Sequence, residues 1–143
     1  MHYNSTLMSR AKYPHLLQAD ANLWDRFLAR NPRRFEDILY DIRVGEGRDP
    51  GDDYNPSIRQ MAIDLSQRRI DAIGITPDEM YIIEISCRPG LKAVGQLIAY
   101  PILFAEKYPT TKAIRTLLVA ETIESDVEPV LKKANIPFEL YPA

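Results

Sequence analysis

The stretch RRIDAIG at residues 68–74, followed by YIIEIS at residues 81–86, decides the fold predicted for this chain of 143 residues. Both segments are rich in isoleucine, which is typical of neighbouring β-strands. The turn sequence TPDE at residues 76–79 lies between them and predicts a hairpin of two strands, at residues 69–75 and 80–87. Each strand carries an acid within its apolar run, Asp71 in the first and Glu84 in the second.

A long helix is predicted after the hairpin, at residues 91–107. Pro89 and Gly90 break the chain before it, and Pro101 is expected to kink or split it. Gln96 and Tyr100 are four residues apart and therefore share one face of this helix. The side chains expected to face the core are Leu91, Val94, Leu97 and Ile98.

A helix, a strand and a second short helix are predicted before the hairpin. The first helix spans residues 20–30, and Asp20 is its expected N-cap. The strand at residues 38–44 alternates in polarity. Its side chains expected on one face are Ile38, Tyr40, Ile42 and Val44. Residues 45–56 read as a long polar loop, and Ser57 is expected to cap the short helix that follows.

The short helix and the last third of the chain complete the pattern. One face of the short helix is apolar and consists of Ile58, Met61, Ala62 and Leu65. An apolar run at residues 113–120 predicts a strand buried on both faces. The pattern Ser125-x-x-Glu128 predicts a capping box at the start of the last helix, and residues 137–141 predict a short final strand.

These elements together predict an α/β fold. The first three strands can form an antiparallel meander, whereas the later strands are joined through helices and can pair in parallel. We therefore expect a mixed β-sheet with helices on both faces. Residues 1–19 are predicted to be an irregular N-terminal segment, and residues 20–143 a single domain.

The order of these motifs resembles the PD-(D/E)XK nuclease superfamily, whose active site combines an Asp, a Glu-x-Lys motif and often a following Gln-x-x-x-Tyr. Asp71 matches the Asp, and Gln96 and Tyr100 match the last motif. The Glu-x-Lys motif reads Glu84-x-Ser86, so a serine stands in the lysine position. The resemblance covers roughly residues 20–120 in element order. It implies a restriction-endonuclease-like mixed sheet flanked by helices.

The resemblance also implies metal-dependent hydrolysis of DNA, with Asp71 and Glu84 as ligands of Mg²⁺ in an active enzyme. Hard cations such as Mg²⁺ prefer carboxylate oxygens. Strand residues two apart share a face, so Glu84 and Ser86 are expected to point the same way. Because a serine hydroxyl carries no charge, Lys92 and Arg88 are the candidates to supply the missing cation.

Structural interpretations compete with these roles. Asp71 could form an ion pair with Arg69 on a solvated face of the sheet. Glu84 lies in an apolar strand and should be paired or metal-bound, and an ion pair with Arg68, Arg69 or Arg88 would satisfy it as well as a metal would. The Gln/Tyr pair of the long helix is equally well explained as its polar edge.

Composition limits the partners and the cellular location expected for this protein. The 18 basic and 20 acidic residues give a net charge of −2, so no overall positive field draws the chain to DNA. A single cysteine, Cys87, excludes an intramolecular disulfide and fits a reducing compartment. No apolar run reaches the ~20 residues that span a bilayer. We therefore expect no membrane partner and a cytoplasmic location, which for a phage protein means the host cytoplasm or the virion.

Two functional hypotheses follow from the sequence. In the first, the chain is a catalytically degenerate nuclease fold that serves as a structural or assembly component, for which a phage virion connector or neck protein is a concrete form. Ser86 and the acidic net charge favour it, and it implies a homo-oligomer or a larger protein assembly. In the second, the chain is an active Mg²⁺-dependent DNA endonuclease or exonuclease that uses Asp71 and Glu84.

Overall fold

A computed structural model describes residues 13–143 of the chain. Most of the segment predicted to be irregular, residues 1–19, falls on residues 1–12, which lie outside the described residues. Within the described part, Tyr13 and Leu16 are buried and belong to the largest hydrophobic cluster of the domain. Among residues 13–143, no helix combines the length and the apolar character needed to cross a membrane.

The described chain folds into four helices and five strands. The helices are α2 (Gln18–Arg30), α3 (Pro56–Ser66), α4 (Leu91–Lys107) and α5 (Glu128–Lys133). The strands are β1 (Asp37–Val44), β2 (Arg68–Ile75), β3 (Glu79–Ile85), β4 (Ala113–Ala120) and β5 (Phe138–Leu140). The predicted hairpin is present, although its second strand ends at Ile85 and not at Cys87.

The five strands form one mixed sheet in the order β1-β2-β3-β4-β5. The first three pair antiparallel, and β4 and β5 join in parallel through helical connections. Helix, antiparallel meander, helix and parallel strand is the core that the resemblance to the PD-(D/E)XK superfamily implies. The predicted α/β class, a mixed sheet flanked by helices, is confirmed.

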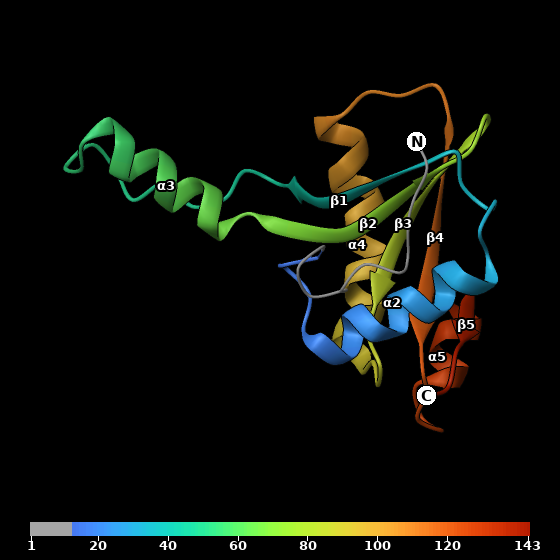
Figure 1. The fold of residues 1–143 in the computed structure, drawn as a ribbon. Coiled ribbons are helices and arrows are strands. Elements are labelled where there is room, and N and C mark those ends of the chain that lie inside the picture. The colour runs from blue at the N-terminus through green and yellow to red at the C-terminus, as the bar shows by residue number, and fades with distance from the viewer. Residues whose placement is uncertain (1–12) are drawn as a thin grey trace.

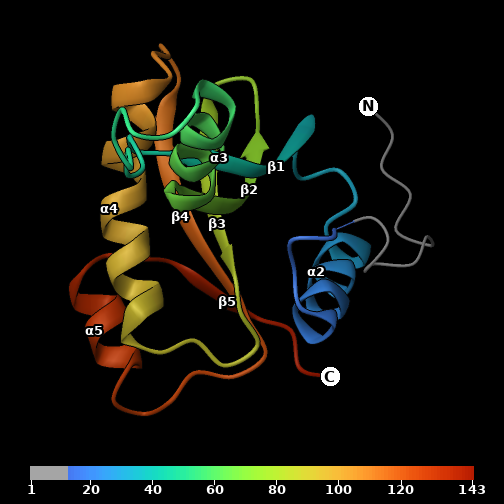
Figure 2. The same cartoon turned by 90° about the vertical axis from the view of Figure 1, so that its left-hand side faces the viewer.

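Helices cover both faces of this sheet (Figures 1 and 2). Helix α2 packs against β3 and β4 from one side through Leu23, Trp24 and Phe27. Helix α4 covers the other side and contacts β1, β3 and β4. Leu97 of α4 and Leu131 of α5 pack with Leu118 of β4 in a separate hydrophobic cluster. Helix α2 and the start of α4 both approach the C-terminal end of β3, the central strand.

Strand β1 changes face in the middle, contrary to the expected alternation. Ile38 and Tyr40 pack with the cluster beneath α2, whereas Ile42 and Val44 pack with the cluster beneath α4. Asp41, which separates the two pairs, has a positive φ of 56°. This left-handed residue turns the strand over, and a strictly two-residue period cannot foresee such a reversal.

A long excursion between β1 and β2 carries α3 away from the sheet (Figure 1). None of the residues of α3 is buried. The helix is capped by Asn55, whose side chain accepts a hydrogen bond from the Ile58 N–H at 2.9 Å, and not by Ser57 as expected. Arg59 stabilises the loop before it through hydrogen bonds to both carboxylate oxygens of Asp49, at 2.7 and 2.6 Å. We call residues 45–67 the arm.

Two other predicted caps are wrong. Helix α2 begins at Gln18 with Leu17 as its N-cap, so Asp20 lies in the first turn of the helix. At α5, the cap is Val127 and no side chain bonds it, which rules out the capping box from Ser125. The Glu124 carbonyl closes that turn instead, because it accepts the N–H groups of Val127 and of the residue after it.

The orientation of α4 also differs from expectation. Leu91 and Ile98 are exposed, whereas Val94 and Leu97 are buried as predicted. The helix is apolar on nearly every side, so the periodicity of its sequence does not reveal which face is buried. Pro101 lies inside α4 without splitting it. Strand β4 is buried only in its second half, from Leu117 onward.

Candidate active site

The two acids of the hairpin meet on interior strands of the sheet, Asp71 within β2 and Glu84 near the end of β3. Asp71 Oδ2 accepts a hydrogen bond from the backbone N–H of Ile85 at 2.9 Å, which ties the acid of β2 to the end of β3. The side chain of Glu84 in turn hydrogen-bonds the side chain of Asp71. The antiparallel register of β2 and β3 places the two carboxyl groups next to each other.

Burial and mutual repulsion change the acidity of this pair. Removal from water and the neighbouring charge of Asp71 raise the pKa of Glu84 to about 9. Burial also raises the pKa of Asp71, although the Ile85 N–H partly opposes it. The hydrogen bond between them lowers the pKa of Asp71 and raises that of Glu84, so it favours a proton on Glu84.

A cavity of about 220 Å³ opens beside Glu84. Its walls include Ser86 from the end of β3, and Lys92 and Gln96 from the first turns of α4. The charge of Lys92 favours the ionised form of Glu84. The serine in the motif's lysine position and a lysine from the next helix therefore line the same space.

Two of the other candidate partners, Arg69 and Arg88, have different neighbours. Arg69 donates to both carboxylate oxygens of Asp41, at 2.7 and 2.5 Å, so it is not the ion-pair partner expected for Asp71. The hydrogen bond from Arg26 is the main cause of the lowered pKa of Glu121, and the charge of Arg88 adds to it. Arg88 does not line the cavity. Of the two cations weighed from the sequence, Lys92 is the one beside Glu84.

Gln96 and Tyr100 brace the helix next to the cavity. The Gln96 side-chain amide donates a hydrogen bond to the Tyr100 hydroxyl at 3.1 Å. Tyr100 is only 5% exposed and packs with Phe104 and Ile70, so it is a core residue rather than a polar edge. Burial raises the pKa of its hydroxyl. Gln96 therefore faces the cavity while Tyr100 supports it from the core.

Two residues near the site were not recognised in the sequence. Asp20, assigned there as a helix cap, accepts a hydrogen bond from the Cys87 N–H at 3.0 Å, and its charge helps to raise the pKa values of Asp71 and Glu84. His15 Nε2 donates to the backbone carbonyl of Asp71 at 3.1 Å. Both come from distant parts of the chain, and no local spacing signals either contact.

The oxygen atoms of the two acids suit a hard divalent cation. Asp71 and Glu84 offer carboxylate oxygens, the ligand type that Mg²⁺ and Mn²⁺ prefer. A cation there would displace the proton that the two acids share. Within residues 13–143, no group of three or more His, Cys, Asp or Glu side chains is placed to hold a metal ion.

Comparisons with known proteins concern the fold. No family model and no curated protein matches the sequence. Among solved structures, an EndoMS–dsDNA2 complex is similar over 89% of this chain, with 18% identity and a TM-score of 0.49. A repair endonuclease from Pyrococcus abyssi is similar over 85%, with 20% identity and a TM-score of 0.48. The chain spans 46% of the length of each of these two proteins.

Proposed function

We propose that this protein is a divalent-metal-dependent deoxyribonuclease whose missing motif lysine is replaced by Lys92. The observation that carries the proposal is the shared cavity, in which Lys92, Ser86 and Glu84 line one space. Family members place a lysine two residues after the Glu, on the same strand. Here the serine leaves room, and the first turn of α4 brings an ammonium group from another direction.

Asp71 and Glu84 would hold the cation in this proposal. The metal, when bound, activates a water molecule and stabilises charge on the reacting phosphate. The hydrogen bond from the Ile85 N–H keeps the Asp71 carboxylate oriented before any ligand arrives. Glu84 must lose the shared proton to bind the cation, and the nearby charge of Lys92 favours that loss.

Lys92 supplies the positive charge that the motif requires. Its ammonium group can neutralise charge that develops on a phosphate in the cavity, a contribution worth about 10²–10³ in rate for one preorganised group. Gln96 lines the same cavity and offers an amide to the substrate backbone.

A second function is supported by a different observation. Ser86 removes the usual cation, and the arm exposes apolar side chains of α3 that catalysis does not need. Both features fit a nuclease fold reused as an assembly component, with a phage virion connector or neck protein as its concrete form. In that case, the acid pair is a structural remnant and Lys92 is an ordinary surface lysine.

Cleavage assays separate the two functions. We expect the purified protein to cut linear, circular or single-stranded DNA in Mg²⁺ or Mn²⁺, and expect Glu84→Gln and Lys92→Met each to reduce the rate at least about 10²-fold. Lys133→Met, an exposed lysine on α5, is the matched control and should leave the rate unchanged.

A rescue experiment tests the specific role of Lys92. Adding Ser86→Lys to the Lys92→Met variant should restore cleavage, because both side chains reach the same cavity. Absence of cleavage in the unmodified protein and in the Ser86→Lys variant, across all DNA forms and both metals, would refute the nuclease proposal and leave the assembly function.

A further inference from the structure

The outer face of α4 carries an unpartnered apolar stripe. Leu91, Gly95, Ile98, Ile102 and Ala105 follow one another at intervals of four, three, four and three residues, the spacing of a coiled-coil seam. All five are exposed, and the three large side chains are between 52% and 63% exposed. The opposite face of α4 is the one that packs on the sheet, so nothing among the described residues covers this stripe.

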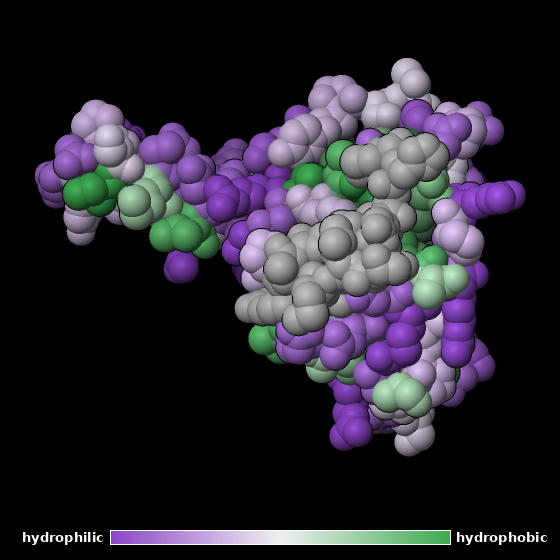
Figure 3. Space-filling view, in the orientation of Figure 1, coloured by the Kyte–Doolittle hydropathy of each residue, from purple (hydrophilic) through white to green (hydrophobic). Residues whose placement is uncertain are grey.

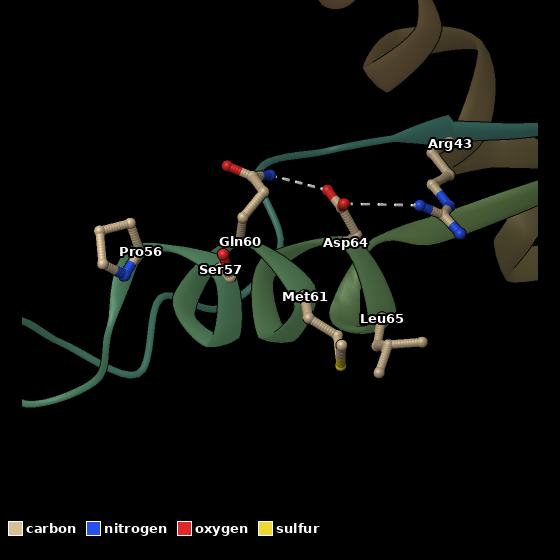
Figure 4. A pocket seen from close by; sticks show the side chains of 7 residues that line it. All are labelled: Arg43, Pro56, Ser57, Gln60, Met61, Asp64 and Leu65. Carbon is tan, nitrogen blue, oxygen red and sulfur yellow. Dashed lines mark hydrogen bonds and ion pairs between the residues drawn. The ribbon is translucent and has the colours of Figure 1, made fainter.

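The arm carries a second stripe of the same kind. Ile58, Met61 and Leu65 of α3 are spaced by three and four residues and are between 48% and 71% exposed. Figure 3 shows apolar atoms along the underside of the arm, and Figure 4 shows Met61 and Leu65 pointing to the same side of α3. An open hollow of about 640 Å³ runs beside these two side chains.

We propose that this chain forms a dimer in which the apolar stripe on α3 of each copy covers the apolar stripe on α4 of the other copy. In this dimer, the arm of each protomer reaches across and lays α3 along the outer face of α4 of its partner. Gly95 and the neighbouring Ala99 leave gaps between the large residues of α4, into which Met61 and Leu65 can insert.

Charge favours this pairing over the alternatives. The arm, residues 45–67, contains five acids and two arginines, so it repels both nucleic acid and another arm. The charged residues of α4 are Lys92, Glu106 and Lys107, which leave this helix net positive. An acidic arm is therefore attracted to α4 of a second copy rather than to a second α3.

The polar groups beside the α3 stripe already have partners within the arm and its base. Arg59 pairs with Asp49 and Asp52, at 2.6 and 2.8 Å. Gln60 donates to Asp64 at 2.8 Å, and Asp64 lies 3.9 Å from Arg43 (Figure 4). Docking of a second copy would therefore desolvate the apolar stripe without stranding an unpaired charge.

Reciprocal exchange also increases the surface area buried in the interface. A specific interface buries about 1,200–2,000 Å² in total, more than one short helix supplies by itself. Reciprocal exchange doubles the contact, because each protomer offers one α3 and one α4 under a two-fold axis. It also closes, so it yields a dimer rather than an open polymer.

The first test is the mass of the full chain in solution, measured by sedimentation and light scattering. We expect a dimer at micromolar concentration. Met61→Asp on α3 and Ile98→Asp on α4 should each give a folded monomer, verified by circular dichroism, with a dissociation constant raised at least 100-fold. Leu17→Asp replaces an equally exposed leucine at the start of α2 and should leave the dimer intact.

The second test identifies which helices meet. In a Cys87→Ser background, an equal mixture of Met61→Cys and Ile98→Cys proteins should form a disulfide between the two variants. Neither variant alone should cross-link. A monomeric unmodified protein, or a dimer that only the Ile98 change disrupts, would overturn the proposal, as would efficient cross-linking of Ile98→Cys to itself.

Discussion

Glu84 and Asp71 are held side by side in a half-buried setting, where ionisation of one disfavours ionisation of the other. The folded protein keeps a proton on Glu84 up to a pKa of about 9, whereas an unfolded chain releases it near the ordinary value of 4.5. The folded state therefore binds more protons between these two values. By linkage, the free energy of unfolding contributed by Glu84 falls as the pH rises through that window.

Glu84→Gln should consequently stabilise the metal-free protein at pH 8. The amide can still donate to Asp71, and it needs no proton from solvent. Because Asp71 shares the site and can relax, we expect a gain of about 1–3 kcal/mol in the free energy of unfolding at pH 8, decreasing to nearly zero at pH 4.5. Urea titrations at both pH values measure it.

The control for this prediction is Glu124→Gln, which changes an exposed glutamate outside the site. Its effect on stability should be small at both pH values. A Glu84→Gln gain of the same size at pH 4.5 and pH 8 would mean that burial, rather than the proton, accounts for it.

At the scale of elements, the arm depends on local interactions. Helix α3 buries no side chain, so the cap from Asn55 and the Asp49–Arg59 pair hold it together. Asn55→Ala should therefore loosen α3 by about 0.5–2 kcal/mol while leaving the sheet unchanged. Hydrogen exchange should show faster exchange in α3 and unchanged protection in β2 and β3.

Asn55→Asp is the matched variant for this measurement, because a carboxylate caps as well as an amide does. It should keep the exchange of α3 slow. If Asn55→Ala instead lowers protection throughout β2 and β3, the arm unfolds together with the domain and is not an independent element.

The sequence predicted the elements and the acid pair, because both depend on local rules. Strand period and the turn at residues 76–79 sufficed to place Asp71 and Glu84 on neighbouring strands. Local rules could not show that Lys92, rather than Arg88, lies beside Glu84. The position of Lys92 depends on where the chain after β3 places the first turn of α4. Likewise, the apolar surface of α4 gave no indication that Leu91 and Ile98 face outward, since that is decided by the sheet beneath the helix.

At the scale of the whole molecule, metal binding and folding stability should be coupled. A cation that binds the folded acid pair and not the unfolded chain stabilises the fold by mass action, by about 2.7 kcal/mol at 100 times its dissociation constant. For a chain of this length, each kcal/mol corresponds to about 2–4 °C in Tm. This coupling would hold for any cation bound at the acid pair, whether or not the site cuts DNA.

We therefore expect Mn²⁺ to raise the Tm of the unmodified protein, and to raise it more at pH 8 than at pH 6. The pH dependence follows because the cation must displace the proton on Glu84, whose pKa is about 9. Removing that proton costs less free energy at pH 8 than at pH 6. Calorimetry with and without Mn²⁺ at both pH values measures the shift. Asp71→Asn and Glu84→Gln should each remove it, whereas Glu124→Gln should retain it. A Tm shift that survives both site variants would locate the cation elsewhere and would separate the acid pair from metal binding altogether.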